Sequence, residues 1–252
     1  MWLLVDIGNS AVKVGLFDPT ATAGGQLLGT RRIEPASDIR SEVATLVGKA
    51  KITRVGGVSV VPSLTPIWKE LTQEICPEPT SFFNSTSQLP FELKYETPST
   101  LGNDRIAVAA GGWTRFGALN SSGVIVVDAG TAINYEVVTS DGAYLGGVIA
   151  PGPGLMRQAL NVGTAQLPPV ELERPPRRVG RSTNEAIRSG IMFGLRDTVH
   201  SMVEGIKEEH AMPFEVVLTG GWGEWLATEL SISFEPELVL KGVADLMRFS
   251  AE

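Results

Sequence analysis

The chain has 252 residues, 43% of them hydrophobic and 19% charged, a composition typical of a globular protein large enough to bury a full core. Its net charge of −7, from 21 basic and 28 acidic residues, argues against a general affinity for nucleic acids or anionic membranes. The single cysteine can form no internal disulfide, and neither a leader peptide nor a long apolar segment is evident, so we expect a cytoplasmic protein.

The first predicted feature is a β-hairpin. The apolar run LLVDIG (3–8) and the alternating run AVKVGLFD (11–18) read as consecutive strands. Gly-Asn-Ser (8–10) between them favours a tight turn, and the first run carries a lone aspartate, Asp6, just before that turn. A third strand is expected to include residues 27–34.

Helices and a strand are expected to follow this hairpin. Ser37 is predicted to cap a helix over 38–49, which has an apolar stripe at helical spacing. The apolar run 55–61 predicts a buried strand. A helix over 65–75 should come next, because Pro66 stands near its start, where proline is favoured.

A second set of strands repeats the theme of the first nearly half a chain later. An apolar run ends in Asp128, and Gly130 and Thr131 follow it. Further strands are predicted over 132–139 and 143–150. We interpret this as an internal duplication, in which each half begins with a hairpin whose turn follows an aspartate.

The remainder of the chain completes the second half. Ser182 and Glu185 form a predicted capping box before a long amphipathic helix. The run FEVVLTGGW (214–222) predicts a strand that ends in a Gly-Gly turn. A stretch rich in Gly, Asn and Ser separates the halves, so the predicted domains are 1–117 and 118–252.

Some conspicuous residues have ordinary explanations. The basic, proline-rich stretch 174–181 is typical of a solvated loop, and Trp222 and Trp225 are expected to pack over the Gly-Gly turn. Tyr95 on its own reads as a strand aromatic.

The two aspartate turns have the features that phosphoryl transfer requires. Gly8 and Gly130 allow a close approach of the backbone to a phosphate, and Lys13 can reach a terminal phosphate oxygen. Asp6 and Asp128 stand at strand ends, where a hydrated cation fits between them. Short hydrogen-bonding side chains are supplied by Asn9, Ser10 and Thr131. One such turn alone is more typical of an ordinary hairpin. Two matched copies and a later Gly-Gly turn favour the arrangement of the actin, Hsp70 and sugar-kinase superfamily.

A third stretch, TLGNDRIAVAAGGW (100–113), adds a candidate base. Asp104 is expected at the start of a helix, where free backbone N–H groups hold a carboxylate and keep it ionised. It would orient an attacking hydroxyl, and Arg105 beside it would bind a substrate carboxylate with two hydrogen bonds. The alternative is a capped helix with a surface arginine.

Together and in this order, these stretches resemble type III pantothenate kinase of bacteria. The matching motifs are DIGNS (6–10), GNDR (102–105), DAGTA (128–132) and GGVIAPG (146–152). The resemblance spans nearly the whole chain. It implies an α/β protein with a duplicated ribonuclease H-like (actin-like ATPase) fold, in which two domains enclose a central cleft.

The resemblance also implies an activity, the ATP-dependent phosphorylation of pantothenate to 4′-phosphopantothenate. This is the first step of coenzyme A biosynthesis. The implied cofactors are Mg²⁺ with ATP and a monovalent cation, K⁺ or NH₄⁺. Family members are homodimers, so the implied partners are ATP, pantothenate and a second copy of the chain, without nucleic acid or membrane.

The resemblance assigns roles to individual residues. Asp104 would be the proton acceptor, Asp128 would hold the monovalent cation and Asp6 would hold Mg²⁺ through water. The implied ATP-binding residues are Asp6, Ile7, Gly8, Asn9, Ser10, Ala11, Val12, Lys13 and Thr131. The implied substrate-binding residues are Tyr95, Gly102, Asn103, Asp104, Arg105 and Thr183.

Two positions depart from the family pattern. Asn103 stands where the family usually has alanine, and Asn134 stands where it usually has threonine. Two alternative functions stay open: a catalytically silent homologue that acts as a regulatory or binding protein, and a different small-molecule kinase on the same fold. The retained carboxylates and lysine argue against the silent homologue.

Overall fold

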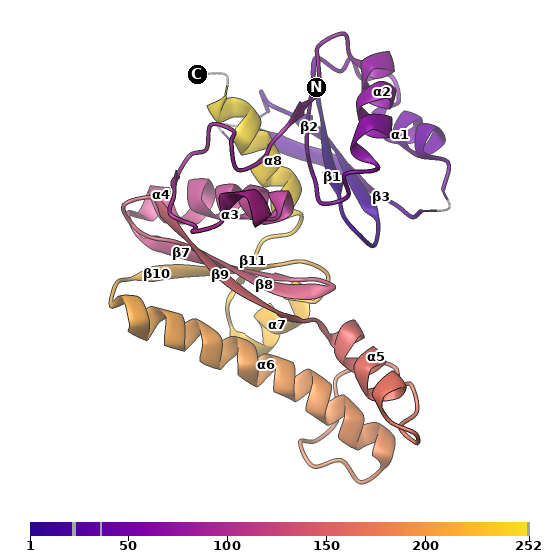
Figure 1. Ribbon diagram of the computed structural model, residues 1–252, viewed down its shortest axis with the longest axis vertical. Coiled ribbons are helices and arrows are strands. Elements are labelled where there is room, and N and C mark those ends of the chain that lie inside the picture. Colours follow the sequence, from indigo (N-terminus) through magenta and orange to yellow (C-terminus); the bar gives the residue numbers. More distant parts are fainter. Residues whose placement is uncertain (22–23, 36, 251–252) are drawn as a thin grey trace.

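Two mixed β-sheets form the main layers of the protein (Figure 1). The structure is a computed structural model that describes residues 1–21, 24–35 and 37–250. The first sheet has the order β3-β2-β1-β4-β5 and comprises β1 (Trp2–Ile7), β2 (Val12–Asp18), β3 (Gln26–Ile33), β4 (Arg54–Ser59) and β5 (Ser81–Phe82). The second has the order β11-β10-β7-β8-β9-β6 and comprises β6 (Glu92–Leu93), β7 (Gly123–Ala129), β8 (Ala132–Val138), β9 (Ala143–Pro151), β10 (Phe214–Thr219) and β11 (Ser233–Phe234).

The two sheets repeat one topology, as the duplicated sequence pattern predicts. In the first sheet β1 is antiparallel to β2 and parallel to β4. In the second, β7 is antiparallel to β8 and parallel to β10. The central strands β1 and β7 are almost wholly apolar because layers cover them on both faces. The expected α/β fold with a duplicated ribonuclease H-like core is therefore confirmed.

Two helices cover the outer face of the first sheet. These are α1 (Ile39–Val47) and α2 (Thr65–Ile75), and their apolar sides join a core with Leu3, Val5 and Ile7 of β1. The prediction that Ser37 caps α1 is wrong. Asp38 is the cap, and its carboxylate accepts hydrogen bonds from the backbone of Arg40 and Ser41 because it stands one residue closer to the helix.

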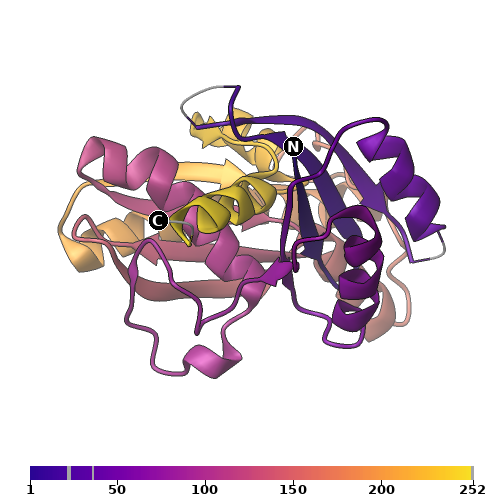
Figure 2. The same cartoon turned by 90° about the horizontal axis from the view of Figure 1, so that it is seen from above.

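A pair of helices lies between the two sheets. Helix α3 (Asn103–Gly112) packs against the C-terminal helix α8 (Leu238–Phe249), and their core includes side chains from both sheets (Figure 2). The contact is close: a Cβ on Gly242 would lie 1.7 Å from the carbonyl oxygen of Ala107. Shorter segments flank α3, namely η1 (Pro98–Thr100), the π-helical turn η2 (Trp113–Gly117) and α4 (Ala118–Asn120).

The far face of the second sheet carries the remaining helices, α5 (Pro153–Gly163), α6 (Thr183–His210) and α7 (Gly223–Leu230). The predicted N-cap of α6 is confirmed, since Ser182 Oγ accepts a hydrogen bond of 3.2 Å from the backbone N–H of Glu185. Helix α5 and the N-terminal part of α6 extend away from the sheets as an arm (Figure 1). Among the described residues, no helix has the length and apolar character needed to cross a membrane.

Candidate active site

The turns of the two hairpins lie against each other. The backbone N–H of Gly8 donates to the carbonyl of Ala11, three residues on, and that of Gly130 donates to the carbonyl of Ala132, two residues on, so each turn closes on its glycine but the first turn is one residue longer. The hydroxyl oxygens of Ser10 and Thr131 are 3.2 Å apart. The duplication thus brings two equivalent turns into direct contact.

A cavity of about 840 Å³ opens where these turns meet. Both aspartates that precede the turns, Asp6 and Asp128, line it, and so does the candidate base Asp104. The other predicted residues on its wall are Gly8, Asn9, Ser10, Ala11, Lys13, Thr131 and Asn134. Three motifs that are far apart in the sequence therefore share one cavity.

Glycines let backbone segments close around the second turn. Gly220, at the end of β10, has a φ of +84°, and a Cβ there would lie 2.4 Å from Oδ1 of Asp128. A Cβ on Gly152 would lie 2.4 Å from the carbonyl oxygen of Gly130. The Gly-Gly turn and the end of the GGVIAPG motif are thus packed directly against the DAGTA turn.

Burial and mutual repulsion perturb the two turn aspartates. The pKa of Asp6 is raised to about 7, mainly by burial and also by the charges of Asp104, Asp128 and Glu237, while Lys13 opposes the shift. Burial likewise raises the pKa of Asp128 to about 6, and Lys13 again opposes the shift. Burial is the largest cause of both shifts, and the cavity wall also carries the positive charges of Lys13, Arg32 and Arg157.

This donor set fits a hydrated divalent cation. Neither Asp6 nor Asp128 makes a side-chain hydrogen bond or ion pair with any part of the chain that the structure describes. Within the same described ranges, no group of three or more His, Cys, Asp or Glu residues could hold a metal alone. Mg²⁺ typically uses one or two carboxylates together with water and substrate phosphates, and the two unpaired carboxylates match that requirement.

Asp104 is held at the first turn of α3. Its Oδ1 accepts a hydrogen bond of 2.8 Å from the backbone N–H of Arg105, as the sequence predicts. Burial outweighs this bond, however, so the pKa of Asp104 is raised and not kept low as expected. Gly102 is needed beside it, because a Cβ there would lie 2.6 Å from the same carboxylate oxygen. A carboxylate with a raised pKa is better suited to accept a proton.

Asn103, which replaces the usual alanine, anchors the start of α3. Its side-chain amide donates a hydrogen bond of 2.8 Å to the carbonyl of Ser59, at the end of β4. The asparagine therefore adds a hydrogen bond between the first turn of α3, which carries Asp104, and the first sheet. Asn134, the other departure, is paired directly with Asp128 across the β7–β8 ladder and lines the cavity.

Arg105 is buried in a network that its motif does not predict. Its guanidinium donates two hydrogen bonds, of 2.7 and 3.0 Å, to the fully buried carboxylate of Glu136. Tyr144 donates a third to the same carboxylate, at 2.6 Å. Burial raises the pKa of Glu136, and the hydrogen bonds from Arg105 and Tyr144 oppose this shift. The alternative of a surface arginine is wrong, since Arg105 is only 6% exposed and both of its bonds in this network go to Glu136.

Tyr95 lies against the same network, after the end of β6 and not within a strand. The guanidinium carbon of Arg105 is 5.9 Å from the centre of its ring. Gly146, with a φ of +116°, leaves room for this ring, since a Cβ there would lie 2.9 Å from it. Tyr95 and Arg105 thus form a layer next to the GGVIAPG motif.

Some predicted site residues do not line the cavity. The side chains of Ile7 and Val12 belong to the apolar core beneath the first sheet, so only their backbones can face a nucleotide. Thr183 is exposed at the start of α6, on the projecting arm. Gly102, Asn103, Arg105 and Tyr95 do not line the cavity either.

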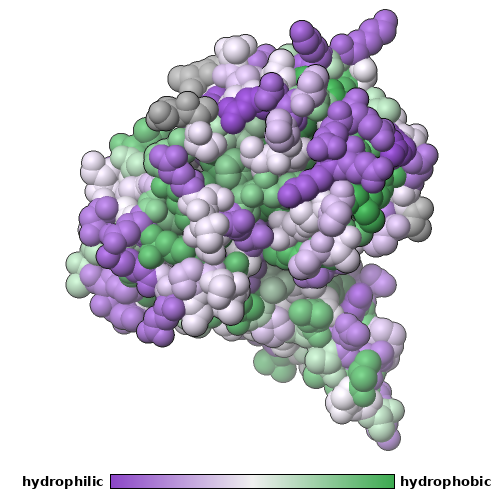
Figure 3. Space-filling view, turned by 45° about the horizontal axis from the view of Figure 1, so that its top comes forward, coloured by the Kyte–Doolittle hydropathy of each residue, from purple (hydrophilic) through white to green (hydrophobic). Residues whose placement is uncertain are grey.

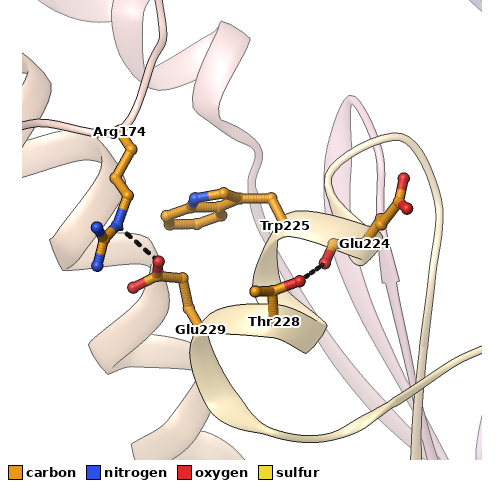
Figure 4. A pocket seen from close by; sticks show the side chains of 5 residues that line it. All are labelled: Arg174, Glu224, Trp225, Thr228 and Glu229. Atoms are coloured by element: carbon orange, nitrogen blue, oxygen red, sulfur yellow. Dashed lines mark hydrogen bonds and ion pairs between the residues drawn. The ribbon is translucent and has the colours of Figure 1, made fainter.

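The basic loop and the tryptophans agree with their ordinary explanations. Arg174 pairs with Glu229 at 2.7 Å beside the indole of Trp225, above α7 (Figure 4). Trp222 and Trp225 both pack against apolar cores, as expected, and Trp222 also lines the cavity.

Several residues of the cavity wall, among them Arg32, Arg157 and Glu237, have no signal in the sequence. Glu237, immediately before α8, accepts a hydrogen bond of 3.0 Å from Lys13 Nζ and lines the cavity. The two residues are 224 positions apart, and no local pattern connects them. Glu136 does have a signal, because it is a lone charge in the otherwise apolar run of β8.

Two duplicated sheets with matched aspartate turns around one shared cavity define a protein of the actin-like kinase fold. Solved structures share this fold. A ROK hexokinase from Thermus thermophilus matches with a TM-score of 0.52 and 15% identity over 97% of both chains. A Campylobacter jejuni protein, assigned provisionally to a Baf family of transcriptional activators, matches with a TM-score of 0.58 and 21% identity over 98% of this chain and 97% of that one.

The chain belongs to the type III pantothenate kinase family, whose family model matches residues 2–205. A type III pantothenate kinase of Chlorobaculum parvum is 35% identical over 99% of this chain and 95% of its own length. Another, of Thermomicrobium roseum, is 34% identical over 96% of this chain and 95% of its own length. The protein is thus a kinase, an enzyme class that uses ATP together with a divalent metal ion.

Proposed function

We propose that this protein transfers the terminal phosphoryl group of ATP to pantothenate, giving 4′-phosphopantothenate and ADP, the first step of coenzyme A biosynthesis. One observation carries the proposal. The two turn aspartates, the contacting hydroxyls of Ser10 and Thr131 and the carboxylate of Asp104 belong to one cavity. Family membership supplies the identity of the substrates.

The two turns would hold the phosphates of ATP between them. The backbone of the 8–11 turn and the hydroxyls of Ser10 and Thr131 are hydrogen-bond donors at the point where the hairpins meet. Lys13, on the wall of the same cavity, supplies the positive charge that a terminal phosphate requires. Donors fixed in advance are effective because they need no rearrangement as charge develops in the transition state.

The unpaired carboxylates would hold the cations. Asp6 is the proposed ligand of Mg²⁺ through water, and Asp128 is the proposed ligand of K⁺ or NH₄⁺. Bound there, the cations would neutralise phosphate charge. Their charge would also favour the ionised carboxylates, which burial disfavours in the free protein.

Asp104 would act as the proton acceptor. It would accept the proton of pantothenate's primary hydroxyl as that oxygen attacks the terminal phosphorus and ADP leaves. In a loose phosphoryl-transfer transition state the base mainly orients the hydroxyl, so a firmly held carboxylate matters more than a strong base. The backbone hydrogen bond from Arg105 and the contact with Gly102 hold Asp104 in this way.

The proposed pantothenate contacts come from Gly102, Asn103, Asp104, Arg105, Tyr95 and Thr183. Arg105 would reach the substrate carboxylate only with guanidinium N–H groups that Glu136 leaves free, because Nε and one terminal nitrogen already donate to Glu136.

We further propose that the protein is a cytoplasmic homodimer. Hydrophobic residues stand among hydrophilic ones on the projecting arm (Figure 3). Leu155 and Val162 of α5 have exposed side chains, and so do Val179 in the loop before α6 and Ile149 on β9. Thr183 lies outside the cavity of its own chain, on this arm. A second copy packed against the arm would cover these apolar side chains.

A coupled assay of ADP release tests the proposed function. The purified protein is given ATP and Mg²⁺, with and without pantothenate, in K⁺ and then in Na⁺ buffer. We expect ADP only when pantothenate is present, and faster release in K⁺. ADP release with sugars or acetate instead would indicate a different kinase on this fold. No release with any substrate would favour the catalytically silent homologue.

A further inference from the structure

Glu237 and Lys13 form an ion pair inside the candidate nucleotide cavity. Lys13 Nζ is 3.0 Å from Oε2 of Glu237, and the two side chains are 32% and 29% exposed. Lys13 lies on β2 opposite Asp6, whereas Glu237 belongs to the loop that enters the C-terminal helix. The pair thus connects the first turn to α8 across the cavity.

The conformation of Glu237 is unusual for its position. Four residues other than glycine have positive φ in the described part of the chain, and Ser121, Ala211 and Ser231 are at helix C-termini, where this conformation is common. Glu237 is the fourth, with a φ of 54°, and it stands at the N-terminus of α8. Its carboxylate makes no capping bond to the helix and is directed to Lys13. A strained residue that gives up capping for another contact suggests a functional constraint.

The contact of Glu237 conflicts with the proposed role of Lys13. An ammonium group held by a carboxylate is already neutralised, so a phosphate must replace that carboxylate before it gains the full attraction of the lysine. Glu237 would then remain as an unpaired negative charge near Asp6 and Asp128. Both effects weaken the binding of a polyanion.

We propose that Glu237 is an internal competitor for Lys13 that lowers the affinity of the empty enzyme for ATP. The inference rests on the proposed function, since it takes the cavity as the ATP site. Glu237 is a positioning residue here: it acts on the nucleotide by holding Lys13. Binding of the phosphates exchanges the Lys13–Glu237 contact for a Lys13–phosphate contact.

A double-mutant cycle measures this competition. The affinity for ATP with Mg²⁺ is determined by calorimetry without pantothenate, so that no turnover occurs, for the wild type, Glu237→Gln, Lys13→Met and the double variant. We expect Glu237→Gln to bind ATP about 3- to 5-fold more tightly than the wild type, the upper part of the range of an exposed ion pair. In the Lys13→Met background the same change should have less than about a 2-fold effect.

Any other outcome of this double-mutant cycle overturns the proposal. Equal tightening in both backgrounds would mean that Glu237 only repels phosphate and does not hold Lys13. Unchanged affinity for ATP in Glu237→Gln would mean that Glu237 has no effect on ATP binding. Weaker binding would mean that Glu237 holds Lys13 where it binds the phosphate. If the wild type itself binds no ATP, the proposed function fails first, independently of Glu237.

Glu235→Gln is the matched control. It removes the same charge from the same loop, but Glu235 pairs with Lys241 and does not line the nucleotide cavity. We expect its affinity for ATP to stay within about 2-fold of the wild type. Tightening as large as that of Glu237→Gln would show a general charge effect and contradict the proposal. Thermal melting of each variant verifies that it is folded.

Discussion

The hydroxyl oxygens of Ser10 and Thr131 are 3.2 Å apart, although 121 positions separate the two residues in the chain. Each hydroxyl follows the glycine of an aspartate turn, one from each half of the duplication. Their contact marks the place where the halves face each other. It therefore defines the centre of the proposed phosphate site, and it is the first target for mutation.

Thr131→Ala should raise the KM for ATP by about 10-fold, because it removes one hydroxyl donor to a charged phosphate, worth about 1.5–3 kcal/mol at most. The KM for pantothenate should change little. Thr131→Ser keeps the hydroxyl and is the control. Steady-state kinetics with each substrate varied in turn measure both constants. Equal values for the alanine and serine variants would show that the hydroxyl does not contact the nucleotide.

Asp104→Asn should lower kcat by roughly 10²- to 10⁴-fold, since it removes the positioned proton acceptor. ATP binding should be nearly unchanged, because Asp104 is assigned to the hydroxyl of the second substrate. Single-turnover kinetics and calorimetry measure the two quantities separately. Near-normal turnover would mean that Asp104 is not the base.

Asp128→Asn should stabilise the free protein at high pH. Burial raises the folded-state pKa of Asp128 from 3.8 to about 6, so the folded state binds more protons than the unfolded state between these values. The free energy of unfolding of the wild type therefore falls as the pH rises through this window. Above it the carboxylate is charged, and the asparagine variant should be more stable by about 1–3 kcal/mol.

This gain should shrink as the pH is lowered and vanish only well below the unfolded-state pKa of 3.8, where both states of the wild type are protonated. Urea unfolding at several pH values, in EDTA and without K⁺, measures it. Adding Mg²⁺ and K⁺ with ATP should stabilise the wild type more than the variant. A variant that is less stable at pH 8 would show that the carboxylate has a favourable partner in the free protein.

Asn103→Ala restores the usual residue of the family and removes the hydrogen bond to Ser59. The free energy of unfolding should fall by about 1 kcal/mol, the usual value of one hydrogen bond. The KM for pantothenate should shift by a few fold, since the first turn of α3, which carries Asp104, loses its hydrogen bond to the end of β4. Asn120→Ala, at the exposed end of α4, is a control for loss of an asparagine. Unaltered stability and KM would mean that the bond has no role.

The sequence predicts the parts of this protein that depend on local patterns. The hairpins around Gly8 and Gly130 follow from apolar runs, turn residues and alternation, and the repeated pattern predicts that the halves are alike. The cap of α1 is misplaced by one residue, because Ser37 and Asp38 are both good caps and only the geometry distinguishes them.

Contacts between distant segments are what sequence patterns miss. The ion pair of Lys13 with Glu237 and that of Arg105 with Glu136 depend on how the halves pack, and no periodicity records it. The same holds for α8, which comes from the end of the chain but packs between the two sheets. The domain boundary between residues 117 and 118 stays a prediction.

The central claim is that the two aspartate turns hold the phosphates of one nucleotide between them. A crystal structure with a non-hydrolysable ATP analogue, Mg²⁺ and pantothenate tests it most directly. We predict phosphate oxygens within hydrogen-bond distance of both Ser10 and Thr131, and the pantothenate hydroxyl next to Asp104. A nucleotide bound elsewhere, or one that contacts only one of the two turns, would contradict the account.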